Sequence, residues 1–270
     1  MSMKGQIAVI TGASSGIGKA CATELAKEGV HIVLAARNEE KLQAAKAECE
    51  ALGVKALAVH CDVSVESDCE NLMMQAIDAF GKIDILVNNA GVSMRAVFAD
   101  LDLSVLKKSM DINFWGMVYC TKYAMPHLLK SKGTIVGVSS IAGFRGLPAR
   151  TGYSASKFAM NGFLEALRTE NLKTGIHVLT LCPGYTASNI RNTAMTNDGS
   201  VQGESPREEG KMMQPEEVAQ HMIKGIRKRK KVIVLTTTGK LTVFLNKWFN
   251  TWMDKKTYEF VKKEPDSPFK

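Results

Sequence analysis

The sequence lacks the long apolar runs and the paired cysteine spacings that mark several classes of protein. No apolar run reaches the roughly eighteen residues of a membrane-spanning helix, and the N-terminus lacks the basic flank, apolar stretch and cleavage site of a signal peptide. These absences predict a cytoplasmic protein. Metal-ligand spacing is also missing, so we expect no metal site and free buried thiols at Cys21, Cys49, Cys61, Cys69, Cys120 and Cys182.

Linkers and repeats are likewise missing. No Pro- or Ser-rich segment and no solenoid-type repeat interrupts the chain, and hydrophobic residues make up 45% of it, as in ordinary soluble proteins. We therefore expect one domain over residues 1–238, followed by a helical extension over residues 239–270.

The net charge of +8 comes partly from one basic cluster. Such a cluster could contact nucleic acid or anionic lipid, but it closes a helical stretch and leads into the apolar run Val232 to Leu235. No aromatic stacking residues or nucleic-acid reading module lie nearby, so we expect a solvated helix end and no nucleic-acid partner. The cluster consists of Lys224, Arg227, Lys228, Arg229, Lys230 and Lys231.

Short apolar runs alternate with longer stretches of helical period. The runs are rich in Val, Ile, Leu and Ala without clean alternation, which is typical of strands covered on both faces by crossover helices. The sequence thus predicts an α/β fold of Rossmann type, with a doubly wound, seven-stranded parallel sheet. The strands are expected at the runs that begin at Ile7, Val30, Val54, Ile83, Thr134, Ile176 and Val232.

A glycine-rich turn follows the first predicted strand and precedes the amphipathic pattern Lys19 to Lys27. Glycines there let the backbone approach a pyrophosphate at the positive N-terminus of the next helix. A purely structural loop is the alternative, but the place in the first βαβ unit favours a dinucleotide site. Its residues are Thr11, Gly12, Ala13, Ser14, Ser15, Gly16, Ile17 and Gly18.

The end of the second predicted strand bears on the choice of nicotinamide cofactor. An acidic residue there would bind the ribose 2′-hydroxyl and repel a 2′-phosphate, but this chain has Ala35-Ala36-Arg37-Asn38. The planar fork of Arg37 can pair with a phosphate. We therefore predict NADP(H), the alternative being that Arg37 is a surface arginine that opens the next helix.

Tyr153 and Lys157 are four residues apart, which places them on one face of a helix. A free phenol titrates near pH 10, and an adjacent ammonium together with the positive charge of the nicotinamide stabilises its phenolate. Tyr153 would then serve as a general acid or base. The spacing alone also occurs by chance in many helices.

These patterns together resemble the short-chain dehydrogenase/reductase family. Its T-G-x-x-x-G-x-G pattern is matched at Thr11 to Gly18 and its N-N-A-G pattern at Asn88 to Gly91, and the resemblance spans about Gln6 to Leu235. It implies that Asp62 and Val63 lie near the adenine. It also implies that the cofactor is bordered by Asn89, Ala90 and Gly91.

The resemblance also implies a catalytic set. Ser140, thirteen residues before Tyr153, would hold the substrate oxygen, with Ser139 as the second choice. Asn113 would kink a long helix and hold a water that links Lys157 to solvent, or would simply bend the helix. Beside the nicotinamide carboxamide the resemblance places Pro183, Gly184 and Thr186.

The implied reaction is hydride transfer between nicotinamide and a carbonyl or alcohol carbon. Loops at Ser93 to Val97, Ile141 to Pro148 and Tyr185 to Gln214 should surround the substrate, with residues 186–214 as a mobile lid. An apolar substrate, or simple packing, is indicated by Phe144, Leu147, Tyr185 and Met195. Reductases of hydrophobic ketones, such as hydroxysteroid dehydrogenases and ketosphinganine reductases, share the Ala-Arg-Asn-Glu sequence seen at residues 36–39.

The segment Lys240 to Met253 is aromatic, basic and of roughly helical period. It suits a helix at a membrane interface, a gate for a lipid-like substrate, or packing against its own domain or a partner subunit. The family resemblance further implies a homodimer or homotetramer through the helices Leu103 to Lys130 and Tyr153 to Lys173. A non-catalytic dinucleotide sensor is the alternative function, and retention of the whole catalytic set argues against it.

Overall fold

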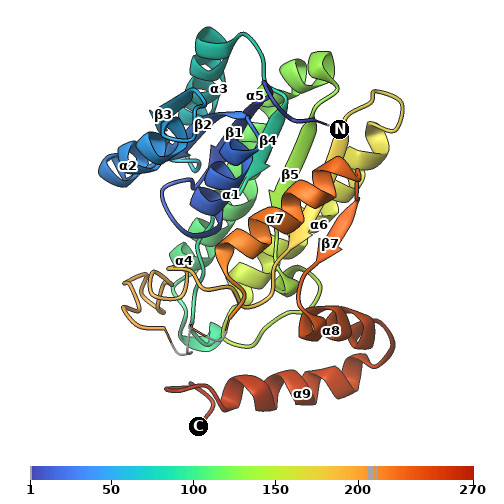
Figure 1. The fold of residues 1–270 in the computed structure, drawn as a ribbon. Helices are drawn as coiled ribbons and strands as arrows, with labels where there is room; N and C mark the ends of the chain where they lie inside the picture. Colours follow the sequence, from blue (N-terminus) through green and yellow to red (C-terminus); the bar gives the residue numbers. More distant parts are fainter. Residues whose placement is uncertain (1, 206–209, 211) are drawn as a thin grey trace.

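A parallel β-sheet forms the centre of the molecule (Figure 1). The computed structural model describes residues 2–205, 210 and 212–270, and this part of the chain contains seven strands in the order β3-β2-β1-β4-β5-β6-β7. Each strand lies within the apolar run that predicted it, and the Rossmann-type doubly wound sheet is confirmed. The strands are β1 (Ile7–Thr11), β2 (His31–Ala36), β3 (Ala56–His60), β4 (Ile85–Asn88), β5 (Thr134–Val138), β6 (His177–Cys182) and β7 (Val232–Val234).

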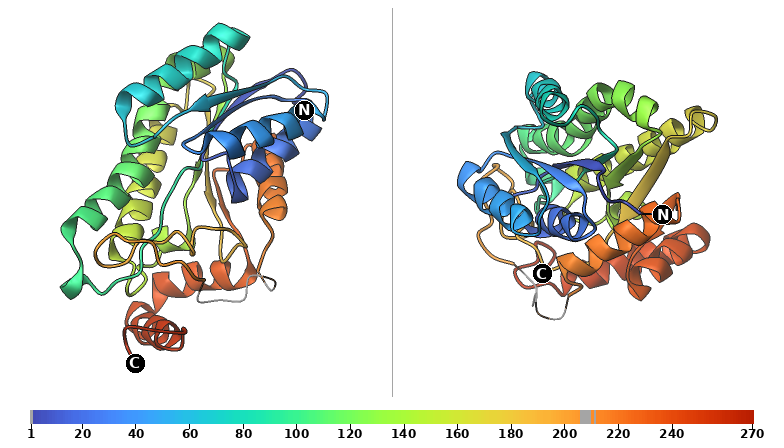
Figure 2. Two further views of the ribbon diagram at one scale, coloured as in Figure 1. Left: turned by 90° about the vertical axis from the view of Figure 1, so that its left-hand side faces the viewer. Right: turned by 45° about the horizontal axis from the view of Figure 1, so that its top comes forward.

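Helices connect consecutive strands and cover both faces of the sheet. Two views show α1, α2 and α7 on one face and α3, α5 and α6 on the other (Figures 1 and 2). Two short 3-10 segments, η1 (Phe98–Asp100) and η3 (Ile141–Gly143), lie in the loops after β4 and β5. The helices are α1 (Gly16–Lys27), α2 (Glu39–Glu50), α3 (Glu66–Phe80), α4 (Leu103–Met110), α5 (Gly116–Ser131), α6 (Thr151–Glu170) and α7 (Pro215–Arg227).

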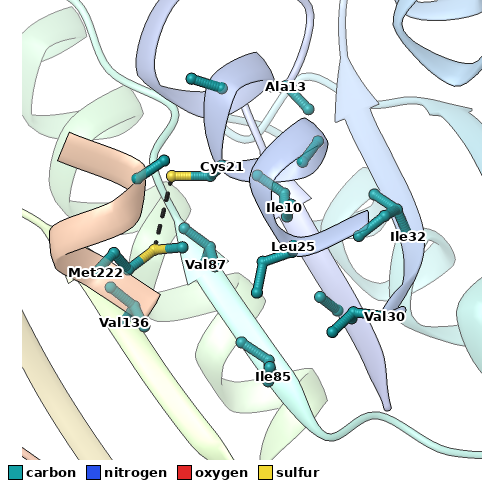
Figure 3. Packing of buried hydrophobic residues seen from close by; sticks show 14 of the residues in the cluster. Ile10, Ala13, Cys21, Leu25, Val30, Ile32, Ile85, Val87, Val136 and Met222 are labelled. Carbon is teal, nitrogen blue, oxygen red and sulfur yellow. Dashed lines mark hydrogen bonds between the residues drawn. The ribbon is translucent and has the colours of Figure 1, made fainter. Parts of the chain in front are cut away.

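Strand β1 shows why the apolar runs are continuous. Its side chains alternate between the two faces, and Ala8 and Ile10 pack in one core while Ile7 and Val9 pack in the other. Both cores are closed to water because helices cover both faces. In the core under α1 and α7, the Cys21 thiol lies 3.6 Å from the sulfur of Met222 (Figure 3).

All six cysteines are free and buried, as predicted. Burial raises the pKa of the Cys21 thiol to about 12. It raises the pKa of Cys182 to the same value. These thiols therefore stay protonated and behave as small apolar core residues.

The long helix predicted over Leu103 to Lys130 is interrupted by one π-helical segment, η2 (Asp111–Trp115), between α4 and α5. Asn113 lies inside this segment, where the family resemblance implied a departure from a regular helix. Just beyond, Gly116 packs so closely on Val63 that a Cβ atom would lie 2.7 Å from the valine Cγ2. This close contact fixes α5 against the loop that follows β3.

The C-terminal extension forms two helices, α8 (Thr237–Trp248) and α9 (Asn250–Lys262), which meet at Phe249. They lie at the carboxyl ends of the strands (Figure 1). Arg145 binds Asn246, Asn250 and Asp254, so the inner side of the extension packs on its own chain. Among the described residues, none of the helices combines the length and the apolar character needed to cross a bilayer.

Candidate active site

Strands β1 and β4 end side by side, and their polar residues hold the glycine-rich turn. The Thr11 hydroxyl accepts the backbone N–H groups of Asn89 (3.0 Å) and Ala90 (3.1 Å). In return, the Asn89 side-chain amide donates to the carbonyls of Thr11 (3.0 Å) and Gly12 (3.2 Å). This reciprocal network fixes the turn at the point where the strand order reverses, which is the usual ligand crevice of such sheets.

Two glycines of the turn are required by its geometry. Gly12 has a positive φ of 64°, and Gly18 leaves so little room that a Cβ atom would lie 2.2 Å from the Gly12 carbonyl oxygen. Helix α1 can therefore start directly against the turn. Its first turn has no side-chain cap, because Ser15 makes no capping hydrogen bond, so its backbone N–H groups are left for a ligand.

A cleft of about 310 Å³ opens at this turn. Most of the residues predicted to bind the cofactor line it, whereas Thr11 and Gly18 do not and instead support the turn from behind. Four residues of the predicted lid also line it, which the sequence reasoning did not specify: Ser188, Asn189, Ile190 and Thr193. The predicted residues are Gly12, Ser14, Ser15, Gly16, Ile17, Arg37, Asn38, Asp62, Val63, Asn89, Ala90 and Gly91.

Arg37 and Asp62 face each other across one end of this cleft. Their nearest charged atoms are 3.6 Å apart, and the Arg37 side chain is 60% exposed. Partial burial raises the pKa of the Asp62 carboxyl, but hydrogen bonds from Ser64 and the charge of Arg37 outweigh it and hold the pKa below its usual value. Asn38 caps α2 by accepting the N–H of Lys41 (2.8 Å), so its side chain serves the helix.

A second cavity of about 360 Å³ adjoins the cleft. The two share lining residues, among them Ile17, Asn89 and Gly91. Ser140, Tyr153, Lys157, Pro183, Gly184 and Thr186 all line this second cavity. The sheet thus brings together residues that are up to 46 positions apart in the chain, from Ser140 to Thr186, as the resemblance implied.

Tyr153 lies in the first turn of α6 and lines the second cavity together with Ser140. The N–H of Ala142 donates to the Ser140 hydroxyl over 3.1 Å and holds it. Burial raises the pKa of the Tyr153 phenol, and the neighbouring Ser140 hydroxyl and the charge of Arg150 offset this only in part. Among the protein groups alone, desolvation of the phenol outweighs the nearby charges, whereas the lowered pKa predicted for Tyr153 combines Lys157 with the positive charge of a nicotinamide.

Lys157 follows Tyr153 by one helical turn and is 3% exposed. Its ammonium donates to the Val138 carbonyl (2.9 Å) and lies 5.8 Å from the centre of the Tyr153 ring. Burial lowers the pKa of Lys157 to about 8. Tyr153 and Lys157 therefore lie on one face of the helix, as predicted, and both line the second cavity.

Asn113 lies behind the cavity rather than in its wall. Its side-chain oxygen accepts the N–H of Val92 (2.7 Å), and its amide donates to the Val92 carbonyl (3.0 Å) and to Ser156 (2.8 Å). A Cβ atom on Gly91 would lie 3.1 Å from this oxygen and 3.7 Å from the Lys157 nitrogen. Gly91 thus leaves open the space between these two groups, while the water relay itself stays a prediction.

Two of the four residues offered as apolar substrate contacts are placed elsewhere. Leu147 and Tyr185 line the second cavity, but Phe144 does not, and Met195 is buried in a separate core cluster with Met94. Met195 is therefore a packing residue. Of the predicted lid, residues 206–209 and 211 lie outside the described residues.

A gate for a substrate was among the roles considered for the C-terminal segment, but the sequence reasoning did not identify which residues of the C-terminal helices line this cavity. Met253, Thr257 and Phe260 line it from α9, and Thr238 and Thr242 line it from α8. The spacing of the α9 residues, three and four apart, is that of one helix face and could have indicated a buried side. It could not have indicated which surface that side covers.

Comparison with known proteins agrees with this architecture. The short chain dehydrogenase family matches residues 6–199, and the chain belongs to the short-chain dehydrogenase/reductase family. It is 43% identical over 184 residues to the 11-beta-hydroxysteroid dehydrogenase-like 4A of Arabidopsis thaliana, a match that covers 67% of this chain and 61% of the plant protein. It is 35% identical over 251 residues to the dehydrogenase/reductase SDR family member 7B of Xenopus laevis, covering 90% of this chain and 78% of that protein.

Solved structures show the same fold. The alcohol dehydrogenase of Thermococcus sibiricus, complexed with 5-hydroxy-NADP, superposes with a TM-score of 0.75 at 25% identity, over 85% of this chain and 95% of that one. A putative short-chain alcohol dehydrogenase of Sinorhizobium meliloti gives a TM-score of 0.67 at 33% identity, over 69% of this chain and 75% of that one. The family resemblance drawn from the sequence is confirmed.

Proposed function

We propose that this protein is an NADP(H)-dependent reductase of hydrophobic ketones. The observation that carries the proposal is the meeting of Ser140, Tyr153 and Lys157 in a cavity that adjoins the glycine-rich cleft. This arrangement places a hydrogen-bond donor, a proton donor and a buried cation next to a site shaped for a dinucleotide. A non-catalytic sensor would not need these three groups together.

The described residues fit a nicotinamide dinucleotide. Gly12 and Gly18 leave a cradle that a Cβ atom would fill, and α1 directs uncapped N–H groups toward it. We assign the diphosphate to this turn and the adenine to the side bordered by Asp62 and Val63. We assign the nicotinamide end to residues 89–91, Pro183, Gly184 and Thr186. When bound, the cofactor would supply the hydride.

Arg37 supports the choice of NADP(H) over NAD(H). The guanidinium is exposed at the end of the cleft where the adenosine ribose would lie, and none of residues 35–38 is acidic. A 2′-phosphate could pair with the planar fork of Arg37, replacing or adding to its contact with Asp62. The Thermococcus neighbour complexed with 5-hydroxy-NADP is consistent with this assignment.

In the reducing direction each of these side chains has a separate role. Tyr153 gives its proton to the carbonyl oxygen, and Ser140 donates a hydrogen bond that holds this oxygen in place. The raised pKa of Tyr153 keeps its proton in place at neutral pH until the oxygen becomes basic. Lys157 stabilises the resulting phenolate, and Asn113 with water returns the proton from solvent.

The walls of the second cavity favour an apolar substrate. Leu147, Ile141 and Tyr185 line one part, and Met253 and Phe260 line the part formed by α9. Apolar ketones gain free energy by leaving water for such a surface, by about 25 cal/mol for each Å² buried. The hydroxysteroid in the name of the Arabidopsis relative is an apolar alcohol, the kind of product that reduction of an apolar ketone would give.

We also propose that two copies pair through the faces of α4–α5 and α6. The exposed aromatic residues Trp115 (44%) and Phe158 (46%) lie on this side. Burial of such side chains between subunits is a common source of dimer stability. Light scattering on the purified protein would give the number of subunits.

The test is oxidation of NADPH and NADH by the purified protein over a panel of ketones, from small diketones through steroids to long-chain ketosphinganine. We expect turnover with NADPH that rises with the apolar size of the ketone. The Tyr153→Phe variant should lose about a hundredfold or more in kcat. Its NADPH affinity, measured by fluorescence titration, should not change.

Tight NADPH binding without turnover on any ketone would contradict the proposal and favour the sensor. Retained activity in the Tyr153→Phe variant would instead show that another group donates the proton.

A further inference from the structure

The C-terminal helices carry a row of exposed apolar side chains that neither the fold nor the cavity uses. We define the aromatic edge as Leu241, Phe244, Trp248, Phe249 and Trp252. Phe244 is 60% exposed and Trp248 is 65% exposed, and all five residues count among the exposed large apolar residues of the described chain. None of the five lines either cavity. Such a concentration of exposed apolar surface within a few turns of helix is typical of an interaction site.

Helix α8 has two opposite faces. Thr238, Thr242 and Asn246, four residues apart, face inward: the threonines line the second cavity, and Asn246 donates to the Phe144 carbonyl over 2.9 Å. Leu241, Phe244 and Trp248 lie on the other side of the same helix. The part of the aromatic edge on α8 is therefore held outward by contacts on the inner face.

Basic residues flank the aromatic edge. Residues 240–256 contain four lysines and one acidic residue, Asp254, whose carboxylate is already paired with Arg145. Two of the lysines lie over tryptophan rings of the edge: the Lys247 nitrogen is 5.6 Å from the Trp248 ring, and the Lys256 nitrogen is 5.3 Å from the Trp252 ring. Apolar rings with ammonium groups beside them match the interface of a membrane that carries anionic headgroups.

We infer that the aromatic edge docks on anionic lipid bilayers and so holds the substrate cavity at a membrane surface. The two helices are the outermost layer at this end of the molecule, with the body of the sheet behind them (Figure 2). Across α8 and α9 five lysines face two acidic residues, Asp254 and Glu259, so a second copy on this surface would bring mostly like charges together, which disfavours a symmetric dimer. The docking step stands alone, whereas delivery of apolar ketones from the bilayer rests on the proposed function.

Sedimentation with vesicles tests the docking step, without cofactor or substrate. The full chain should bind vesicles of phosphatidylcholine and phosphatidylserine and should bind much less to phosphatidylcholine alone. Raising the salt from about 0.1 M to 0.5 M should weaken the binding, because the headgroup charge is screened. Trp248 and Trp252 should show a blue-shifted emission that brominated lipid quenches.

Matched variants identify the surface. Replacing Leu241, Phe244 and Trp248 by serine should lower the partition coefficient by about tenfold or more. Leu172→Ser, at the opposite end of the sheet, should not change it, although Leu172 is 70% exposed. Lys247→Glu should weaken binding by about fivefold or more. Lys228→Glu, in the basic cluster before β7, should not.

Three outcomes would overturn the docking proposal. The first is absence of binding to either kind of vesicle, and the second is equal binding by the serine variant and its Leu172→Ser control. The third is a concentration-dependent dimer in light scattering that the serine variant abolishes, which would assign the edge to a second copy. Turnover of a water-soluble ketone, measured in the same preparations, separates these failures from a failure of the proposed function, because no residue of the edge lines the cavity.

Discussion

Glu264 should control whether the C-terminal helices stay docked. Its side chain is 1% exposed, and one carboxylate oxygen lies 2.8 Å from a guanidinium nitrogen of Arg150 and 3.6 Å from one of Arg95. Those two arginines are themselves only 10% and 11% exposed. The Glu264→Gln substitution keeps the shape of the side chain and removes its charge.

The size of the effect follows from this burial. At an effective dielectric constant of about 20, attractions at these distances are about 6 and 5 kcal/mol before desolvation is counted. Removing one member of a buried ion pair costs about 3–5 kcal/mol, because the remaining charges stay buried. The glutamine retains one hydrogen bond, so we expect a loss of about 3 kcal/mol, which corresponds to a fall in Tm of about 6–10 °C.

Thermal unfolding and hydrogen exchange measure this loss. Exchange should speed up across α9, and most of the sheet should keep its protection. Glu259→Gln is the matched control, because Glu259 lies on the exposed side of the same helix. If the two variants have the same Tm and the same α9 exchange, the role given to Glu264 is wrong.

Three further predictions concern the cleft and the buried lysine of the second cavity. Arg37→Asp should shift the ratio of kcat/KM for NADPH over NADH toward NADH by about tenfold or more, because the new carboxylate repels a 2′-phosphate; an unchanged ratio would mean that Arg37 does not read this phosphate. Gly18→Ala should weaken NADPH binding and cost about 1–3 kcal/mol of stability, because its Cβ has no room. Gly162→Ala, with nothing within 4 Å of its Cβ, should be neutral or stabilising in the same urea titration. The pKa of Lys157 is about 8 in the folded protein and higher, near 10.5, in the unfolded chain. Below pH 8 the folded protein buries a charged lysine, which lowers its stability. Between pH 8 and 10.5 the folded protein holds this lysine neutral while the unfolded chain still binds the proton, so the free energy of unfolding rises with pH. Wild-type stability should therefore rise over that range by about 3 kcal/mol relative to Lys157→Met, and parallel curves for the two proteins would contradict the lowered pKa.

The sheet could be predicted from the sequence because its physical cause is local. Strands buried on both faces need apolar residues at most positions, and β1, β2 and β6 show this as nearly continuous apolar runs. The glycine-rich turn could also be predicted, because Gly12 and Gly18 lie where the backbone leaves no room for a Cβ atom. Residues whose role follows from their own strand or turn were therefore found in place.

Features that depend on distant contacts could not be predicted in the same way. The helical period over residues 240–253 gives no sign of the break at Phe249, which separates α8 from α9. Nor does it show that Arg145, about a hundred positions earlier, binds a side chain from each of these helices. The raised pKa of Tyr153 had a similar cause, because spacing reveals its neighbour in the helix and not the desolvation of its hydroxyl.

The two cavities share part of their lining but differ in one wall. Every described residue that lines the cleft lies between Gly12 and Thr193, whereas the outer wall of the second cavity comes from α8 and α9. On the ribosome the cleft residues are therefore all synthesised before this wall exists, and a ligand that binds the early part would stabilise it as it folds. Over evolutionary time, substitutions confined to α8 and α9 can change which molecules enter the second cavity while leaving the cleft at the glycine-rich turn intact.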